Sequence, residues 1–140
     1  ARIHLLPKKI RKFILIIFPI LIYSQKDSLA ISINNGKSLY NDFCIICHMH
    51  DGKGQKGIFP PLAKSDFLFK NMEESIKAIK FGGIDGEIIV NGVKYDSKME
   101  KMGLYDDEIA DIMNYILNSW ENNYDKRITE EYVKSLKTLK

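Results

Sequence analysis

Acidic residues are absent from the first 26 positions of this 140-residue chain, although five Lys and Arg lie within residues 1–24. From Gln25 onward the chain holds 16 Lys and Arg against 18 Asp and Glu. The positive sign of the formal net charge of +3 therefore comes from residues 1–24, the leader. This distribution excludes a basic nucleic-acid-binding domain. With 45% hydrophobic and 28% charged residues, the length and composition predict one small globular domain.

Long hydrophobic runs are also absent. The longest apolar stretch covers residues 13–23, and as a helix it would extend only about 16 Å, against about 30 Å for a hydrocarbon core. This favours a cleaved segment over a permanent membrane span, and the basic start, the apolar run and the small Ser24 are typical of a secretory signal. We predict a cleaved signal peptide over residues 1–24, a linker over 25–32, a domain over 33–140 and a periplasmic or otherwise exported protein.

Cysteine and histidine are scarce, and most of them stand together. The stretch "FCIICHMHDGKG", residues 43–54, contains both cysteines and two of the three histidines. Cys44-x-x-Cys47-His48 is the attachment motif of a c-type haem, because two thiols at this spacing can each add to a vinyl group of one porphyrin. The adjacent His48 is then placed to bind the iron. The cofactor we predict is one covalently attached haem c.

Two other uses of this motif stay open. Export to an oxidising compartment allows a redox-active Cys-x-x-Cys, but such a motif is expected beside a βαβ pattern, and this one precedes a glycine-rich loop. A structural zinc needs about four ligands, and Cys44, Cys47, His48 and His50 are crowded into seven residues.

The second axial ligand of such an iron decides the function. His4 belongs to the leader and His50 is too close to His48, so a second histidine ligand is excluded within one chain. Met99 and Met102 lie in an irregular segment with enough chain to cross the haem edge, and either can serve. The other methionines are too near His48 or lie on apolar helix faces, where core packing is expected: Met49, Met72 and Met113.

Apolar periodicity and turn residues predict a mostly helical chain. Ser32 or Asn34 is expected to cap the first helix, and Asn91-Gly92 is expected to form the two-residue turn of a hairpin. The expected elements are a helix from about residue 33 to Cys44, a loop over 50–68, a helix over about 71–81, a hairpin over 88–95, a helix over 106–119 and a short helix after Thr129.

Four segments in order give this chain a specific resemblance over about residues 35–136: "NGKSLYNDFCIICH", "DGKGQKGIFPPLAKSDF", "VNGVKYDSKM" and "LYDDEIADIMNYILNSW". They resemble the class I monohaem cytochromes c. The resemblance implies an all-α cytochrome c fold, with three to five helices around one covalently attached haem and a small β-hairpin near residues 88–95.

The resemblance also implies roles for individual residues. Met99 would be the distal ligand beside His48, the carbonyl of Pro60 would accept a hydrogen bond from His48, and Tyr95 would help bury the haem. Gly36 would let the first helix pack closely on the last long one. One departure is Glu100, which stands where relatives usually carry proline and keeps Met102 in competition. His50 is expected to face solvent.

An iron held by imidazole and thioether has no open coordination position. We therefore expect an exported one-electron carrier rather than an enzyme, either a monomer or a subunit or donor of a respiratory oxidoreductase complex. Its redox partner proteins are expected to dock at Lys53, Lys56, Lys98 and Lys101. The alternative is a haem protein with an open sixth site, acting as a gas sensor or a peroxidase-like enzyme.

Overall fold

The computed structural model describes residues 28–138, and the chain divides into two units, Ala1–Ile31 and Ser32–Lys140. The predicted signal peptide, residues 1–24, and His4 lie outside the described residues. In residues 28–138, no helix is both long and apolar enough to cross a membrane.

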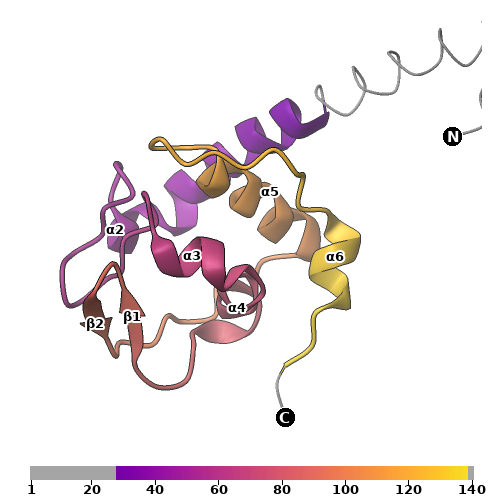
Figure 1. Ribbon diagram of the computed structural model, residues 1–140. Coiled ribbons are helices and arrows are strands. Elements are labelled where there is room, and N and C mark those ends of the chain that lie inside the picture. The colour runs from indigo at the N-terminus through magenta and orange to yellow at the C-terminus, as the bar shows by residue number, and fades with distance from the viewer. Residues whose placement is uncertain (1–27, 139–140) are drawn as a thin grey trace, which may run out of the picture. The chain divides into compact units, whose positions relative to one another are not determined.

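Helices dominate the second unit (Figure 1). Residues 32–43 are helical, followed by α2 (Ile45–His48), α3 (Asp66–Lys70), α4 (Met72–Lys77), the π-helical turn η2 (Ala78–Gly82), β1 (Ile88–Val90), β2 (Val93–Tyr95), α5 (Asp106–Leu117) and α6 (Glu130–Ser135). The prediction of an all-α fold with one small hairpin is confirmed.

The hairpin turns at the predicted dipeptide. Strands β1 and β2 are antiparallel with Val90 opposite Val93, and Asn91 and Gly92 have φ values of 48° and 77°. Positive φ at both turn residues matches the right-handed twist of the strands, which is why this dipeptide favours the turn. The amide and side chain of Asn91 exchange hydrogen bonds of 2.7 and 3.0 Å with Asp66, so the turn is fastened to the start of α3.

The predicted start of the first helix is wrong. Residues 28–32 are already helical, and Ser32 lies inside the helix instead of capping it. Its side chain is buried, donates a hydrogen bond to the carboxylate of Asp111 and accepts one from Asn114 at 2.8 Å. This polar contact with α5 gives Ser32 a partner from another helix, which its local sequence does not reveal.

Two other elements differ from the expected boundaries. Helix α3 begins inside the predicted loop because the Ser65 hydroxyl caps it by accepting from the amide of Leu68 at 3.2 Å. The helix expected over residues 71–81 is α4 followed by η2, in which the amide of Gly83 bonds the carbonyl of Ala78 at 2.9 Å. Such π turns are rare and often lie at functional sites.

The first helix and α5 cross at Gly36. A Cβ there would meet the carbonyl oxygen of Asp111 and lie 2.9 Å from Cβ of Tyr115, so only glycine allows this approach. Beside the crossing, the rings of Tyr40, Tyr115 and Trp120 pack with centroids 5.1–5.5 Å apart. The predicted close packing of these helices at Gly36 is therefore present.

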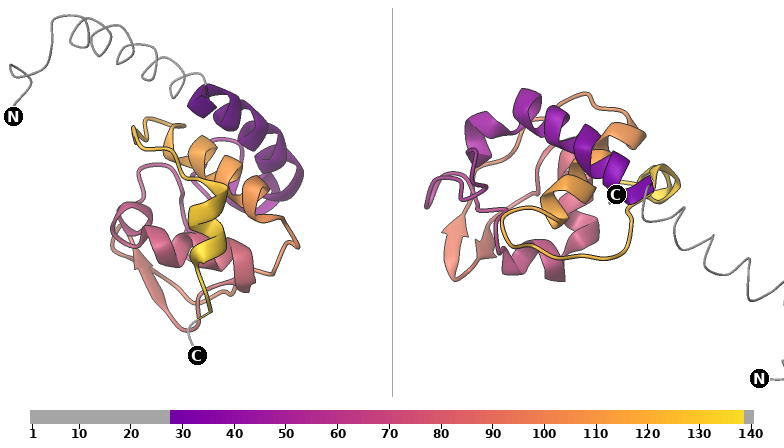
Figure 2. Two further views of the ribbon diagram at one scale, coloured as in Figure 1. Left: turned by 90° about the vertical axis from the view of Figure 1, so that its right-hand side faces the viewer. Right: turned by 90° about the horizontal axis from the view of Figure 1, so that it is seen from above.

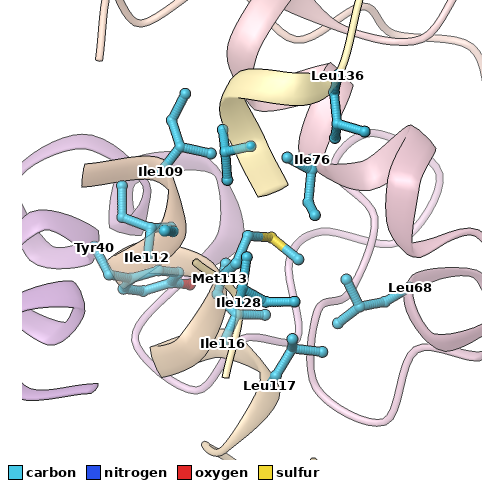
Figure 3. Packing of buried hydrophobic residues seen from close by; sticks show 12 residues of the cluster. Tyr40, Leu68, Ile76, Ile109, Ile112, Met113, Ile116, Leu117, Ile128 and Leu136 are labelled. Atoms are coloured by element: carbon cyan, nitrogen blue, oxygen red, sulfur yellow. The ribbon is translucent and has the colours of Figure 1, made fainter. Parts of the chain in front are cut away.

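The apolar face of α5 forms the centre of the core (Figure 3), and α6 lies against this helix (Figure 2). Burying each large aliphatic side chain contributes about 1.5–3 kcal/mol. The cluster contains Tyr40, Leu68, Ile76, Ile109, Ala110, Ile112, Met113, Ile116, Leu117, Ile128, Val133 and Leu136. This core packs the helices around a cavity that the attachment motif borders.

Candidate functional site

The attachment motif lies at the junction of two helical segments. The first helix ends at residue 43, Cys44 forms a turn, and Cys47 and His48 lie in α2. The amide of His48 donates to the carbonyl of Cys44 at 3.0 Å, which keeps this segment in one helical turn. As a result Cys44, Cys47 and His48 line the same cavity, which has a volume of about 300 Å³.

The ring of His48 is held by a backbone acceptor. Its Nδ1 lies 2.9 Å from the carbonyl oxygen of Pro60, which is the contact that the resemblance implies. Because a carbonyl only accepts, Nδ1 carries the hydrogen and Nε2 keeps a free lone pair. Burial lowers the pKa of His48, while the hydrogen bond to Pro60 acts in the opposite direction. The side chain is therefore a neutral imidazole with a metal-binding nitrogen to offer.

The glycine-rich loop brings Pro60 under this ring. The amide of Gly54 donates to the carbonyl of His48 at 3.1 Å, and Gln55 pairs with Phe59 in an isolated β-bridge. A Cβ on Gly54 would meet the carbonyl of Phe59 and lie 2.8 Å from that of Pro60. Gly54 therefore allows the two arms of the loop to approach closely enough for the His48–Pro60 bond.

Asn122 fastens the same loop to the end of α5, a role that the sequence did not suggest. Its amide nitrogen donates to the carbonyls of Leu62 at 3.0 Å and Ile116 at 2.8 Å. Its oxygen accepts from the amide of Lys64 at 2.8 Å. The side chain is buried, so these three bonds replace water and fix the loop behind the imidazole.

The predicted methionines also line the cavity. Tyr95, Met99 and Met102 all line it, with Tyr95 buried and both methionines partly buried. Cys44, Cys47, His48, Pro60, Tyr95 and Met99, the six predicted site residues, thus border one cavity, and so does Met102. Further apolar side chains complete the lining: Phe67, Leu68, Ile79, Ile84, Ile88 and Val90.

These donors and this lining fit a porphyrin. A haem site combines an apolar enclosure with axial nitrogen or sulfur ligands and, in the c-type, a cysteine pair for attachment. Each of these is present on the cavity wall, with the imidazole already oriented by Pro60.

The thiols do not have the properties of a redox-active pair. Burial, with a smaller effect of the neighbouring Cys47, raises the pKa of the Cys44 thiol to about 11. A reactive Cys-x-x-Cys needs a thiolate near neutral pH and therefore a lowered pKa. The β1–β2 hairpin is also the only sheet among residues 28–138, so the expected βαβ setting is missing there. The thiol oxidoreductase alternative is disfavoured.

A zinc site is disfavoured as well. Within the described part of the chain, no three His, Cys, Asp or Glu side chains come together as a set of metal ligands. His50 is exposed, as predicted, and its backbone carbonyl accepts a hydrogen bond from the Trp120 indole at 3.0 Å.

The remaining methionines have the expected structural positions. Met113 is 1% exposed inside the core, and Met72 is partly buried and packs against this core cluster. Met113 also lines the cavity, which the helical periodicity did not indicate. Met49 is exposed and has a φ of 63° directly after His48, where the hydroxyl of Tyr40 donates to its carbonyl at 2.7 Å.

Only half of the predicted lysine set keeps an unpaired charge. Lys53 pairs with Asp51 at 2.9 Å and Lys98 pairs with Asp85 at 2.6 Å. Lys56 and Lys101 are exposed and form no ion pair with any residue of 28–138. The positive field expected of the four lysines is therefore reduced to these two side chains.

Comparison with known proteins shows what this arrangement resembles. Residues 33–120 match the family model for cytochrome c. A protein of Thermus thermophilus, cytochrome c-552, is 34% identical over 120 residues, which cover 80% of this chain and 80% of that protein.

Two longer relatives match over a smaller part of their length. The cytochrome c subunit of the quinone alcohol dehydrogenase of Gluconobacter oxydans is 30% identical over 75% of this chain and 22% of that subunit. The cbb3-type cytochrome c oxidase subunit FixP of Bradyrhizobium diazoefficiens is 31% identical over 63% of this chain and 30% of FixP.

Proposed function

Because the chain belongs to the cytochrome c family, we propose that it is an exported one-electron carrier with a single covalently attached haem c. The observation that carries this proposal is the apolar cavity bordered by Cys44, Cys47 and His48 together with Met99 and Met102. The haem supplies a one-electron couple between ferric and ferrous iron. The chain attaches it, binds its iron and keeps water away.

Cys44 and Cys47 attach the group through two thioether bonds. Both residues line the cavity, and the bond from the His48 amide to the Cys44 carbonyl keeps the helical turn between them closed. Because the attachment is covalent, the carrier keeps its cofactor when it leaves one partner for another.

His48 binds the iron through Nε2. The Pro60 carbonyl holds the hydrogen on Nδ1, which fixes the tautomer and makes the imidazole a better electron donor. Gly54 and Asn122 act through the loop that presents this carbonyl, so they are positioning residues.

Met99 is the proposed sixth ligand, and Met102, which also lines the cavity, is its competitor. A thioether at the iron would leave no coordination position for a substrate, so the chemistry that the bound haem would supply is electron transfer without substrate binding at the metal. Sulfur ligation favours the ferrous state. The apolar lining acts in the same direction, because a medium of low polarity disfavours the extra charge of ferric iron.

The partner is a redox protein with an acidic surface patch. Lys56 and Lys101 supply the unpaired positive charge for weak, salt-sensitive docking. Two relatives are named as subunits of a dehydrogenase and an oxidase, which supports work beside or within a respiratory complex. The proposed export rests on the leader, residues 1–24, whose basic start precedes an apolar run.

The test is the ligation of the iron in the purified, haem-loaded protein. The ferric spectrum should show the weak long-wavelength sulfur-to-iron band, and the ferrous protein should not bind carbon monoxide readily. Rapid carbon monoxide binding without the sulfur band would instead support the open-site sensor or peroxidase-like enzyme.

A further inference from the structure

The segment that carries both candidate methionines has no regular structure of its own. Residues 96–105 form no helix or strand. Glu100, directly after Met99, is exposed and leaves the backbone without the φ restraint of a proline. The position of Met99 therefore depends on what the segment packs against.

Two side-chain contacts tie this segment down before Met99. The Ser97 hydroxyl donates to the carbonyl of Ile58, and Lys98 pairs with Asp85. The ion pair is largely exposed, with 58% and 91% of its side chains accessible, so it contributes little to the conformation. Neither contact involves Met99 itself.

Gly83 packs directly against the backbone of Met99. It follows η2 with φ 65° and ψ 177°, a region open essentially to glycine. A Cβ on this residue would lie 2.9 Å from the carbonyl oxygen and 3.0 Å from the amide nitrogen of Met99, and would also meet Cγ of Lys98. The Lys98 side chain could rotate away, but the Met99 peptide groups could move only with the segment.

The backbone beside Met102 is not held in this way. A Cβ on Gly103 would meet nothing within 4 Å. Gly82 makes a looser contact between the two methionines, since its Cβ would lie 3.2 Å from the amide nitrogen of Lys101. The fit is thus closest at Met99 and opens toward Met102.

We propose that Gly83 is a positioning residue that places Met99, rather than Met102, at the sixth coordination position. This inference rests on the proposed function and deepens it. The π turn η2 directs the Gly83 backbone against the Met99 peptide. Because Gly83 has no side chain, the segment of residues 96–105 can lie close to it, and in this position the Met99 thioether is the ligand. With a side chain at position 83, the segment would be lifted and ligation would depend on Met102.

The test compares the sulfur-to-iron band of haem-loaded variants. Met102→Ala should keep the band, because Met99 is the ligand. Gly83→Ala combined with Met102→Ala should lose it, because the displaced Met99 has no substitute. A double variant that keeps the full band would overturn the proposal.

Gly86 provides the matched control. It also has a positive φ, 86°, but a Cβ there would meet nothing within 4 Å. Gly86→Ala with Met102→Ala should therefore keep the band. If the double variant Gly86→Ala with Met102→Ala lost the band as completely as Gly83→Ala with Met102→Ala, general backbone strain would explain the result and the proposal would be wrong.

A second variant covers failure of the first to fold with haem. Gly82→Ala with Met102→Ala introduces the milder contact with Lys101 and should give a partial loss of the band; a full band would count against the proposal. A wild-type protein that lacks the band and binds carbon monoxide would overturn the proposed ligation itself. If the wild-type protein shows the band and the double variant Gly83→Ala with Met102→Ala keeps it in full, only the role of Gly83 is overturned.

Discussion

Nδ1 of His48 and the carbonyl oxygen of Pro60 lie 2.9 Å apart, with the Gly54 backbone packed against the Pro60 carbonyl. The substitution Gly54→Ala should push these groups apart. Because this hydrogen bond is partly buried, losing it should lower the free energy of unfolding by roughly 0.5–1.5 kcal/mol. The reduction potential should rise, because the imidazole becomes a poorer donor to the iron. Denaturant titration and redox titration measure both effects.

Gly57→Ala is the control for that variant. Gly57 has a φ of 77°, close to the 61° of Gly54, but a Cβ on Gly57 would meet nothing within 4 Å. Both substitutions carry the strain of positive φ, so their difference isolates the contact with the Pro60 carbonyl. Equal potentials in the two variants would show that this contact does not govern the donor strength of His48.

Replacing the sixth ligand should change the potential and open the iron. Met99→Ala should abolish the sulfur-to-iron band, lower the reduction potential and allow carbon monoxide to bind the ferrous protein. Met102→Ala, which removes the other thioether that lines the cavity, should leave all three nearly unchanged. The reverse pattern would identify Met102 as the ligand.

Asn122 should matter more for stability than its polar, loop-like sequence context suggests. Asn122→Ala removes bonds to Leu62, Lys64 and Ile116 and leaves buried backbone groups unpaired. We expect a loss of about 2–4 kcal/mol in the free energy of unfolding, from about 1–3 kcal/mol for each unsatisfied group with partial relaxation.

The exposed neighbour Asn123 is the control, and Asn123→Ala should change the free energy of unfolding by less than about 0.5 kcal/mol. Thermal or urea unfolding of the haem-loaded protein compares the two. If the two variants proved equally stable, the three bonds of Asn122 would not hold the loop.

Local patterns predicted what local chemistry decides. The spacing of Cys44, Cys47 and His48 indicated attachment, the Asn91-Gly92 pair placed the hairpin, and apolar periodicity located α5. The family resemblance placed Pro60 beside His48. Each depends on neighbours in the sequence or on a motif that relatives share.

Motif spacing, turn residues and apolar periodicity do not predict contacts between segments that are distant in the sequence. The local sequence favours Ser32 or Asn34 as a helix cap, because nothing near Ser32 in the sequence shows that its side chain contacts Asp111 and Asn114. Asn122 donates a hydrogen bond to the carbonyl of Leu62, 60 residues away. Apolar periodicity does not indicate such a long-range hydrogen bond. The π turn before Gly83 likewise depends on the packing of its surroundings. Ser65 is a residue type that favours helix caps, but the glycines and prolines before it favour a loop, so the start of α3 is not predicted.

Unpaired lysines should govern the reaction with anions. Lys56→Ala with Lys101→Ala should slow oxidation of the ferrous protein by hexacyanoferrate(III) a few-fold at low ionic strength and reduce the salt dependence of the rate. Stopped-flow measurements at two ionic strengths test this.

The neutral control removes an ion pair instead. Asp51→Ala with Lys53→Ala deletes one charge of each sign and should leave the rate and its salt dependence unchanged. A pair variant as slow as the lysine variant would show that charge at the two unpaired positions is not what steers the reagent.

The central claim is that Cys44 and Cys47 hold one haem covalently in the cavity that His48 borders. The most direct measurement is the intact mass of the protein, produced together with a c-type haem maturation system and analysed under denaturing conditions, with a thiol titration beside it. The account predicts a mass raised by one haem and no titratable thiol. An unmodified mass with two titratable thiols would contradict it.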